Sequence, residues 1–253
     1  MPTSLPRTVV EMNYALAAQR YLHSLPPEHF MEARSQSKQR EITLASLELV
    51  HAKRSEVQLF NELLVQYDRG ENKRPGQVVP DNMIVIHDKP IVADLSYDVP
   101  IQPVPPFWVL DYLSKNSTRK DYLNNMEQYE SELKIPYYMR YCRDTEDLTL
   151  FQLRRGKFIA VEPNYRGRLE LPELELEMAL LDGWVRFWHR AELLLLPGEL
   201  LNAIKSEQEQ QVHLMQEIFK VEQQIKLKDQ QLLDQDRKMA LLETELKRFR
   251  GET

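Results

Sequence analysis

Two aspartates lie in segments where carboxylates could bind a metal ion, and Asp111 is the first of them. It lies within the otherwise apolar segment Pro106–Ser114. Alternation along a strand puts it on the same face as three apolar residues, Phe107, Val109 and Leu113. Burying a carboxylate is costly unless a cation or several hydrogen bonds compensate it. The simpler interpretation is an aspartate at the frayed end of a strand.

Asp81 is the second candidate. It lies between Pro80 and a predicted strand at Met83–Ile86, where an isolated aspartate is usually a turn residue. Together, Asp81 and Asp111 suggest a metal site, because two acids at the ends of neighbouring strands can converge on one divalent ion. The two are 30 residues apart, with a proline-rich loop between them. Hard oxygen ligands favour Mg²⁺ or Mn²⁺, so the pair predicts a site for one of these ions.

The elements that must position the two aspartates are helices and strands in mixed order. Helices are predicted at Glu11–Ser24, Ser37–Val50 and Arg119–Leu133. Strands are predicted at Val57–Tyr67, Met83–Ile86, Phe107–Leu113, Tyr137–Tyr141, Leu148–Leu153, Lys157–Val161, Leu174–Leu181, Trp184–His189 and Leu193–Leu196. This order indicates the α/β (α+β) class, with a mixed β-sheet core flanked by helices.

The predicted helix after the Asp111 strand has a capping signal and an apolar stripe. Thr118 and Asp121 have the spacing of a capping box, which gives Asp121 a structural role. Four residues recur at helical spacing and predict core packing rather than ligand contacts: Tyr122, Met126, Tyr129 and Leu133.

The composition changes near Pro197-Gly198, and residues 199–250 contain neither proline nor glycine. Two series at heptad spacing run through this tail: Ile204, Gln211, Ile218, Ile225, Leu232, Met239 and Leu246, and Glu207, Leu214, Val221, Lys228, Gln235, Leu242 and Phe249. Ten of these fourteen positions are apolar, which favours a coiled coil over a solitary solvated helix. Because an isolated apolar stripe needs a partner to bury it, we expect a homo-oligomer.

Composition excludes several classes of function. With only 7 glycines, the chain has no GxGxxG or GxxxxGK[ST] phosphate-binding loop, and its six histidines form no HExxH pair. One cysteine, Cys142, indicates a reducing compartment. No run of 18 apolar residues predicts a membrane span, and the N-terminus lacks a secretory pattern, so we expect a cytoplasmic protein. The net charge of −6 argues against coating nucleic acid by bulk charge, but not against a local DNA cleft.

Four motifs in order resemble the Uma-type family of predicted bacterial restriction endonucleases, within the PD-(D/E)XK nuclease superfamily. They are Val79-Pro-Asp-Asn-Met-Ile-Val-Ile86, Val109-Leu-Asp-Tyr-Leu-Ser114, the helix from Asp121 to Tyr129, and Ile135-Pro-Tyr-Tyr138. The family pattern has a Pro-Asp before a strand, an acid in a V-[E/D]-x-L-S strand, a helical D-x-x-x-K-x-x-x-Y, and G-V-x-x-Y. The resemblance covers about residues 30–180. It implies an N-terminal helical extension (1–35), a nuclease-like domain (36–197) and a coiled-coil helix (198–250).

Carried over residue by residue, the resemblance implies that Asp81 and Asp111 bind the metal. The family's helical lysine falls on Asn125, which supplies no cation. Lys115 in the connecting loop and Lys120 in the first turn of the helix are the two substitutes. Glu41, on the preceding helix, matches a position where the superfamily often places an additional acid.

The implied activity is metal-dependent hydrolysis of DNA phosphodiester bonds. Mg²⁺ or Mn²⁺ would polarise the phosphate and lower the pKa of the attacking water, and a lysine would stabilise the developing negative charge. Basic residues that could contact DNA phosphates are Lys115, Arg119, Lys120, Arg140, Arg143, Arg154, Arg155 and Lys157, although such charges are also common on solvated faces. The alternative is a catalytically impaired nuclease fold that acts as a DNA-binding or assembly module. The asparagine at position 125 favours that alternative.

Overall fold

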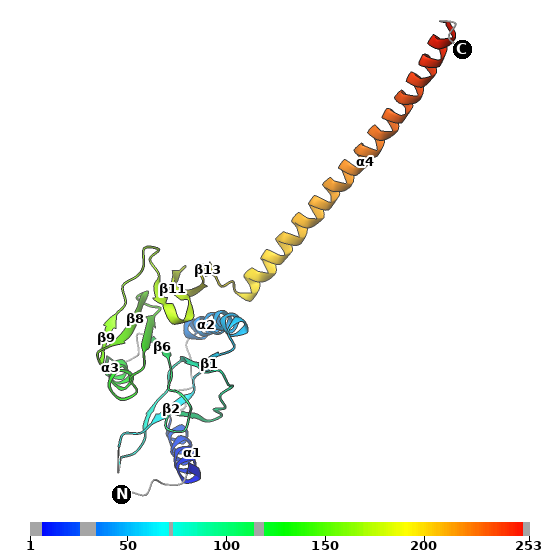
Figure 1. The fold of residues 1–253 in the computed structure, drawn as a ribbon. Helices are drawn as coiled ribbons and strands as arrows, with labels where there is room; N and C mark the ends of the chain where they lie inside the picture. The colour runs from blue at the N-terminus through cyan, green and yellow to red at the C-terminus, as the bar shows by residue number, and fades with distance from the viewer. Residues whose placement is uncertain (1–6, 26–33, 71–72, 114–118, 250–253) are drawn as a thin grey trace. The chain divides into compact units, whose positions relative to one another are not determined.

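The computed structural model describes residues 7–25, 34–70, 73–113 and 119–249, without the side chains of residues 34, 119–122 and 248–249. The chain divides into two compact units, Met1–Leu196 and Pro197–Thr253 (Figure 1). The first unit is a mixed α+β structure, which confirms the predicted fold class. Its helical segments are α1 (Arg7–Ser24), α2 (Arg34–Lys53), α3 (Arg119–Glu127), the π-helical turn η2 (Gln128–Glu132) and the 3₁₀ turn η3 (Pro172–Leu174).

A six-stranded mixed sheet forms the centre of this unit. Its strand order is β1-β4-β6-β7-β8-β9, and β6 and β7 run parallel while the other neighbours are antiparallel. Strand β6, which carries Asp111, is therefore an interior strand with a partner on each side. The strands are β1 (Val57–Asn61), β4 (Asn82–Ile86), β6 (Trp108–Leu113), β7 (Tyr137–Cys142), β8 (Asp147–Arg154) and β9 (Lys157–Ala160).

Two smaller sheets complete the unit. One has the order β10-β11-β12-β13, with strands Leu169–Leu171, Leu176–Leu181, Trp184–His189 and Glu192–Leu193. The other has the order β3-β2-β5, with strands Gly76–Val78, Leu64–Tyr67 and Ser96–Asp98. Helix α1 packs on this last sheet, where the buried Gln66 side chain donates to the Tyr14 carbonyl over 2.9 Å.

The single strand predicted at Val57–Tyr67 is wrong. The structure divides it into β1 and β2, which belong to different sheets. Glu62 between them has a φ of +48°, in the left-handed region that turns an extended chain aside. Both halves are rich in strand-forming residues, so local composition does not reveal the break.

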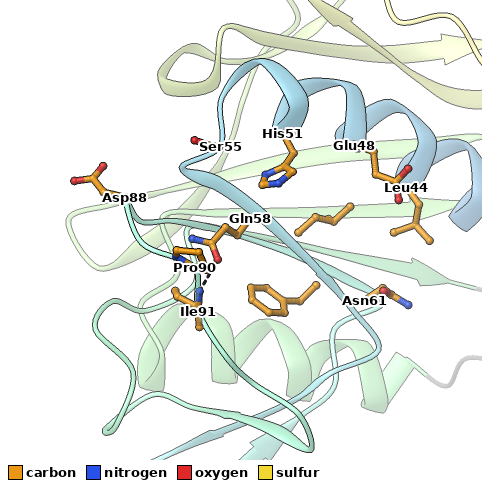
Figure 2. Close-up of a pocket in the computed structure, with 11 residues that line it drawn as sticks. Leu44, Glu48, His51, Ser55, Gln58, Asn61, Asp88, Pro90 and Ile91 are labelled. Carbon is orange, nitrogen blue, oxygen red and sulfur yellow. Dashed lines mark hydrogen bonds between the residues drawn. The ribbon is translucent and has the colours of Figure 1, made fainter.

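A cleft of about 580 Å³ lies beside edge strand β1 (Figure 2). Helix α2, strand β1 and the loop after β4 line it, and Glu48 and His51 of α2 contribute polar groups. Its apolar lining residues are Leu44, Leu59, Phe60, Pro90 and Ile91. At one end it reaches Asn61, which pairs in the β1–β4 ladder with Asn82, the residue directly after Asp81.

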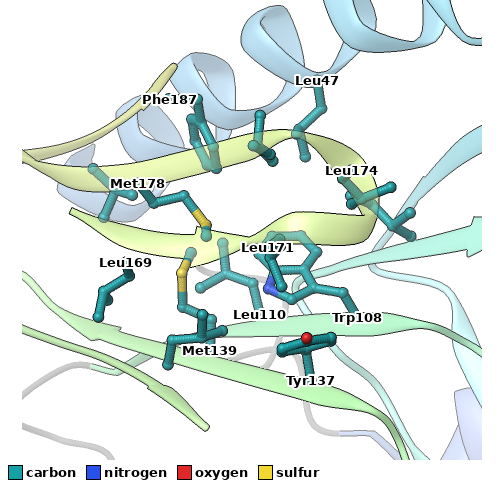
Figure 3. Packing of buried hydrophobic residues seen from close by; sticks show 14 of the residues in the cluster. Leu47, Trp108, Leu110, Tyr137, Met139, Leu169, Leu171, Leu174, Met178 and Phe187 are labelled. Carbon is teal, nitrogen blue, oxygen red and sulfur yellow. The ribbon is translucent and has the colours of Figure 1, made fainter. Parts of the chain in front are cut away.

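The hydrophobic core covers both faces of the central sheet. On one face, Trp108 and Leu110 of β6 pack below residues of the β10–β13 sheet that include Met178 and Phe187 (Figure 3). On the other face, Val109 belongs to a second buried cluster that includes Tyr129, Leu133, Ile135 and Tyr138. Asp111 has the same parity as Val109, so it lies on the face covered by α3 and η2.

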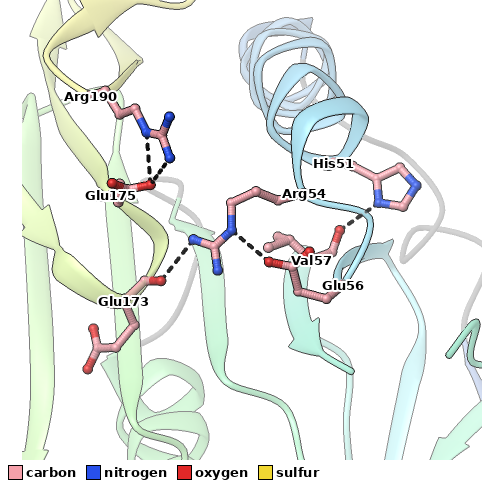
Figure 4. A network of polar contacts seen from close by, with 7 residues as sticks. All are labelled: His51, Arg54, Glu56, Val57, Glu173, Glu175 and Arg190. Carbon is pink, nitrogen blue, oxygen red and sulfur yellow. Dashed lines mark hydrogen bonds and ion pairs between the residues drawn. The ribbon is translucent and has the colours of Figure 1, made fainter. Parts of the chain in front are cut away.

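Ion pairs and hydrogen bonds join the end of α2 to the β10–β13 sheet (Figure 4). The Arg54 guanidinium donates to Glu56 over 2.8 Å and to the Glu173 carbonyl over 2.9 Å. Arg190, directly after β12, forms an ion pair of 2.8 Å with Glu175, directly before β11. These contacts fix the C-terminal end of the helix whose earlier turns lie near the two aspartates.

The helix predicted at Arg119–Leu133 ends in a π-helical turn. Leu133 donates its N–H to the Gln128 carbonyl over 2.8 Å, five residues back. Lys134 follows with a φ of +52°, and Ile135 donates to the Tyr129 carbonyl over 2.9 Å. The family pattern has glycine where this chain has Lys134. A side chain disfavours a positive φ, and glycine adopts one without this cost, which explains why the pattern has glycine at this position.

Lys134→Gly is therefore expected to raise the free energy of unfolding, by about 0.5–1 kcal/mol. Urea denaturation of the wild type and the variant measures it. Lys89→Gly is the matched control, because Lys89 is exposed and is not among the residues with positive φ. A glycine there should not stabilise the fold, so equal effects of the two substitutions would contradict the strain at Lys134.

The second unit contains α4 (Pro197–Phe249), one uninterrupted helix of 53 residues. From Leu201 to Lys247 all of its side chains are exposed. In the part of the chain that the structure describes, no helix combines the length and apolar character needed to cross a membrane.

Candidate functional site

The strand register brings Asp81 and Asp111 to the same place. Strands β4 and β6 are antiparallel, with Asn82 opposite Leu110 and Met83 opposite Val109. Continuing this register by one residue sets Asp81 opposite Asp111. Opposite residues on antiparallel strands have side chains on the same face, with Cβ atoms about 4.5–5.5 Å apart. Two carboxylates from distant parts of the sequence therefore face one small region.

Each carboxylate is held by specific donors. Asp81 Oδ2 accepts the backbone N–H of Tyr112 over 2.6 Å. Asp111 is 4% exposed and accepts three side-chain hydrogen bonds. The Tyr129 hydroxyl donates to Oδ1 over 3.2 Å, while the Tyr138 hydroxyl and the Asn125 amide each donate to Oδ2 over 3.3 Å. These donors compensate part of the cost of burial and fix the orientation of both carboxylates.

The electrostatics of the pair favour a bound cation. Burial, and then the negative charge of Asp111, raises the pKa of Asp81 well above its ordinary value, although the Tyr112 N–H partly opposes the rise. Burial also raises the pKa of Asp111, against the donors Asn125, Tyr129 and Tyr138. Two opposed carboxylates with raised pKa values hold a proton at pH values where an ordinary aspartate is already charged, and a divalent ion would replace that proton.

The tyrosines remain protonated donors. Burial, followed by the charge of Asp111, raises the pKa of Tyr129 and of Tyr138 far above the ordinary value. Both hydroxyls therefore keep their protons throughout the physiological range and can donate to a carboxylate that is either charged or metal-bound.

The pair fits a magnesium-type ion. Among the described residues, no three histidine, cysteine, aspartate or glutamate side chains gather in a group that could hold a metal ion. Two carboxylates alone do not suit a closed structural zinc site. Mg²⁺ keeps several of its waters and is commonly bound by one or two carboxylates plus substrate phosphates. Asp81 and Asp111 are such a donor set.

Among the described residues, Arg40 of α2 is a cation close enough to act on Asp81. Its positive charge opposes the rise in the pKa of Asp81, and it forms a close ion pair with Glu62, which follows β1. Glu41, next along α2, is exposed and is not among the groups that shift the pKa of either aspartate. Lys115 lies outside the described residues, and so does the side chain of Lys120. Their predicted roles, and that of Glu41, stay predictions.

Several of the basic residues predicted to contact DNA are engaged in ion pairs. Arg140 pairs with Asp147 at 3.3 Å, Arg143 with Glu146 at 3.2 Å, and Lys157 with Glu130 at 2.8 Å. Arg143 also lies over the Trp184 ring at 4.5 Å, and Lys38 lies over the same ring at 5.5 Å. Arg154 donates to Gln152, and Arg155 is exposed. The side chain of Arg119 is outside the described residues.

A buried polar network supports the site from the opposite face. The Gln39 amide of α2 donates to Thr43 over 3.3 Å and exchanges hydrogen bonds with the backbone of Val185 in β12. The Tyr112 hydroxyl lies 2.8 Å from Thr43 Oγ1 and 2.6 Å from Asn82 Oδ1. Asn82 and Tyr112 each directly follow one of the two aspartates, so the network fixes the backbone that carries both.

Sequence reasoning missed three side chains of the site. Tyr129 was assigned to core packing alone, but its hydroxyl contacts Asp111. Tyr138 has the same role, and both tyrosines occupy the tyrosine positions of the family pattern, which was the signal that could have identified them. Arg40 had no local signal, because only the fold brings α2 close to Asp81.

The cleft beside β1 is a poor place for a polyanion. Glu48 and Asp88 are among its lining residues (Figure 2). His51 uses Nδ1 to donate to the Val57 carbonyl over 2.7 Å (Figure 4). Phosphate backbones favour surfaces lined by lysine and arginine. The two aspartates, rather than this cleft, are therefore the candidate functional site.

Comparison with known proteins identifies the family of the chain. No curated protein matches the chain. Similar solved structures include a protein of Anabaena variabilis ATCC 29413 described as “a putative nuclease belonging to DUF820”, with 14% identity and a TM-score of 0.43 over 57% of this chain and 75% of that one. A family model described as “Uma2: Putative restriction endonuclease” matches residues 30–186. That match covers more than half of the chain, and the protein belongs to the Uma2 family.

Proposed function

We propose that this protein is a metal-dependent endonuclease that hydrolyses phosphodiester bonds in DNA. The observation that carries the proposal is the pair formed by the half-buried Asp81, directly before β4, and the buried Asp111 of β6, which the strand register sets opposite each other and whose pKa values are raised. Two opposed carboxylates away from bulk water destabilise a fold unless a cation or donors compensate them, so the pair favours a function that needs both. Membership of a restriction-endonuclease family supports the same chemistry.

Asp81 and Asp111 would hold Mg²⁺ or Mn²⁺. When bound, the ion would polarise the scissile phosphate and lower the pKa of the attacking water. Tyr129 and Tyr138 orient the Asp111 carboxylate by donating to it, and the Tyr112 N–H orients Asp81. Arg40 stands on the Asp81 side, where its positive charge can offset charge that develops on the phosphate.

Plasmid cleavage tests the proposal directly. Supercoiled DNA is incubated with the protein and Mg²⁺, Mn²⁺ or EDTA, and nicked and linear products are separated on a gel. Cleavage that requires the ion supports the proposal. If no divalent ion supports cleavage of double-stranded or single-stranded DNA, nuclease activity is rejected.

Metal affinity should rise with pH. Because the pKa values of Asp81 and Asp111 are raised, the pair holds a proton in the folded protein at pH values where an ordinary aspartate is already charged. Metal binding must displace that proton, so affinity should increase by up to about tenfold per pH unit until the raised pKa values are passed. Titration calorimetry with Mn²⁺ alone, in two buffers of different ionisation enthalpy, counts the protons released. Binding without proton release at about pH 6 would contradict the shifted pair.

A second candidate function is a nuclease fold that has lost catalysis and acts as a DNA-binding or assembly module. The observation that favours it is Asn125, which contacts Asp111 where the family pattern has a lysine. Such a module would bind DNA without cutting it in any metal. Gel-shift and cleavage assays on the same preparation therefore separate the two functions.

The tail helix and the free cysteine support two further proposals, on assembly and on location. We propose that α4 joins copies of the chain into a homo-oligomer through its apolar heptad positions. We also propose a cytoplasmic location, which suits the free cysteine Cys142 and a DNA substrate. Light scattering of the purified protein tests the first, and fractionation of cells tests the second.

A further inference from the structure

Helix α4 presents an apolar face that nothing covers within the described residues. Nine of the apolar heptad positions are each 51–58% exposed: Ile204, Leu214, Ile218, Val221, Ile225, Leu232, Met239, Leu242 and Leu246. They recur at the 3.5-residue spacing of a coiled-coil seam over most of the helix. Burying such a seam is the main source of stability for a long solvated helix, so the face requires a partner.

We infer that the partner is a second copy of this chain, paired in parallel and in register. The inference deepens the proposed self-association and rests on it. The seam has isoleucine at three positions of the first series, and leucine at two of the second, a distribution that favours two parallel strands. In the heptad notation abcdefg, the first series occupies the a positions and the second series the d positions.

The interruptions of the seam favour the parallel, in-register arrangement. In that arrangement each residue faces its own copy, so every apolar position faces an apolar one and no charged position faces an apolar one. Gln211 and Gln235 face glutamines, while Glu207 and Lys228 face the same residue of the second copy at the edges of the seam. In either antiparallel arrangement that keeps the helices fully overlapped, Lys228 faces Ile218 or Ile225 of the second copy. Glu207 then faces Leu246 or Met239. Antiparallel pairing therefore buries charges against apolar side chains, which is costly.

The charges that flank the seam also favour the parallel arrangement. Four acids occupy successive e positions: Glu222, Asp229, Asp236 and Glu243. Antiparallel pairing sets e against e, so in the two fully overlapped arrangements Glu222 meets either Glu222 or Asp229 of the second copy. Parallel pairing sets each g residue against an e residue five positions later, so Gln224 and Gln231 meet acids and Lys238 meets Glu243. Of these four g–e pairs in the parallel arrangement, Glu217 with Glu222 is the one that brings like charges together.

Lys228 has a specific place in the parallel pair. At a d position, it enters a hole on the second helix that includes Asp229 of the second copy. Its long aliphatic stem can cover the seam while the ammonium reaches that carboxylate. A charged layer of this kind specifies register at some cost in stability. Because both copies of residue 197 then lie at the same end, both nuclease domains are attached there, which suits cutting the two strands of one DNA molecule.

Disulfide trapping tests the orientation. Cys142, the single native cysteine, is replaced in a Cys142→Ser background, and Met239→Cys is introduced at an a position. In parallel register the two introduced cysteines face each other, so mild oxidation should convert most of the protein to a disulfide-linked dimer of twice the 30.0 kDa chain. In an antiparallel pair the residue opposite is 214 or 207, at least about 37 Å away along the helix, far beyond disulfide reach.

Ala240→Cys is the matched control, because residue 240 is one position along at b and faces away from the seam. It should give little cross-linking under the same conditions. Light scattering tests whether the chain self-associates and how many copies associate. A monomer would overturn self-association, a trimer would overturn the two-stranded pair, and a dimer in which Met239→Cys fails to cross-link would overturn the parallel register. None of these readouts depends on nuclease activity.

Discussion

Replacing Asp111 with asparagine should lower the rate of Mg²⁺-dependent DNA cleavage by about 10³-fold or more. A metal ion contributes several kcal/mol to stabilising charge in the transition state, and about 4 kcal/mol corresponds to a factor of 10³. Asparagine keeps the shape of the side chain and removes its charge, so the ion loses one of its two carboxylates. Asp81→Asn should have a similar effect, since the two acids face each other across β4 and β6.

The same substitution should stabilise the fold at alkaline pH. The folded pKa of Asp111 is raised by burial, so the folded protein retains a proton that the unfolded chain releases. The free energy of unfolding therefore falls as pH rises from the ordinary pKa through the raised one, and it stays low above that range. Asp111→Asn should remove this loss, on the order of 1–3 kcal/mol at about pH 8, with little difference at about pH 4.

Rates from plasmid cleavage and midpoints from urea denaturation at the two pH values measure both effects. Asp88→Asn is the matched control, because Asp88 is an exposed acid in the loop after β4. It should change neither the cleavage rate nor the pH dependence of stability. An Asp111→Asn variant that cuts DNA normally would contradict the role of Asp111 as an essential metal ligand. A variant that is inactive but destabilised at about pH 8 would contradict the electrostatic account of the pair.

Asn125→Lys is expected to raise the cleavage rate by about 10²-fold. The Asn125 amide lies 3.3 Å from Asp111 Oδ2, so a lysine at this position starts from a backbone already directed at the site. An ammonium there can stabilise negative charge on the phosphate, and one well-placed donor is worth about 10²–10³ in rate. It should also lower the pKa of Asp111, because an opposite charge within a few ångströms favours the carboxylate.

Asn124→Lys is the control for overall charge. Asn124 is exposed and adjacent, so the substitution adds the same charge without directing it at Asp111. Cleavage rates at saturating DNA, together with gel shifts, separate catalysis from tighter DNA binding. If both variants raise the rate equally, the gain reflects general attraction to DNA. If Asn125→Lys leaves the rate unchanged, another cation already serves the site, and Arg40 is the first to replace.

How much of the fold the sequence predicts depends on the range of the interactions involved. Periodicity and proline boundaries, which act within a few residues, predicted the strands around Asp81 and Asp111 and helices at 11–24 and 37–50. The structure extends these helices to 7–24 and 34–53. The break at Glu62 does not follow, since both flanking segments favour strands and a single positive φ redirects the chain. The short strands Gly76–Val78, Ser96–Asp98 and Leu169–Leu171 were missed because three residues show no clear alternation.

For the candidate site, too, some features follow from the sequence and others only from the tertiary structure. The sequence alone identified Asp81 and Asp111 as acids in strand contexts, noted that Asn125 replaces a lysine, and indicated a seam along the C-terminal helix. Only the tertiary structure set the aspartates opposite each other, directed the Tyr129 and Tyr138 hydroxyls at Asp111, and brought Arg40 to Asp81. Residue type and spacing are local properties of the chain. Register, burial and the pKa of a carboxylate depend instead on residues that only folding brings together.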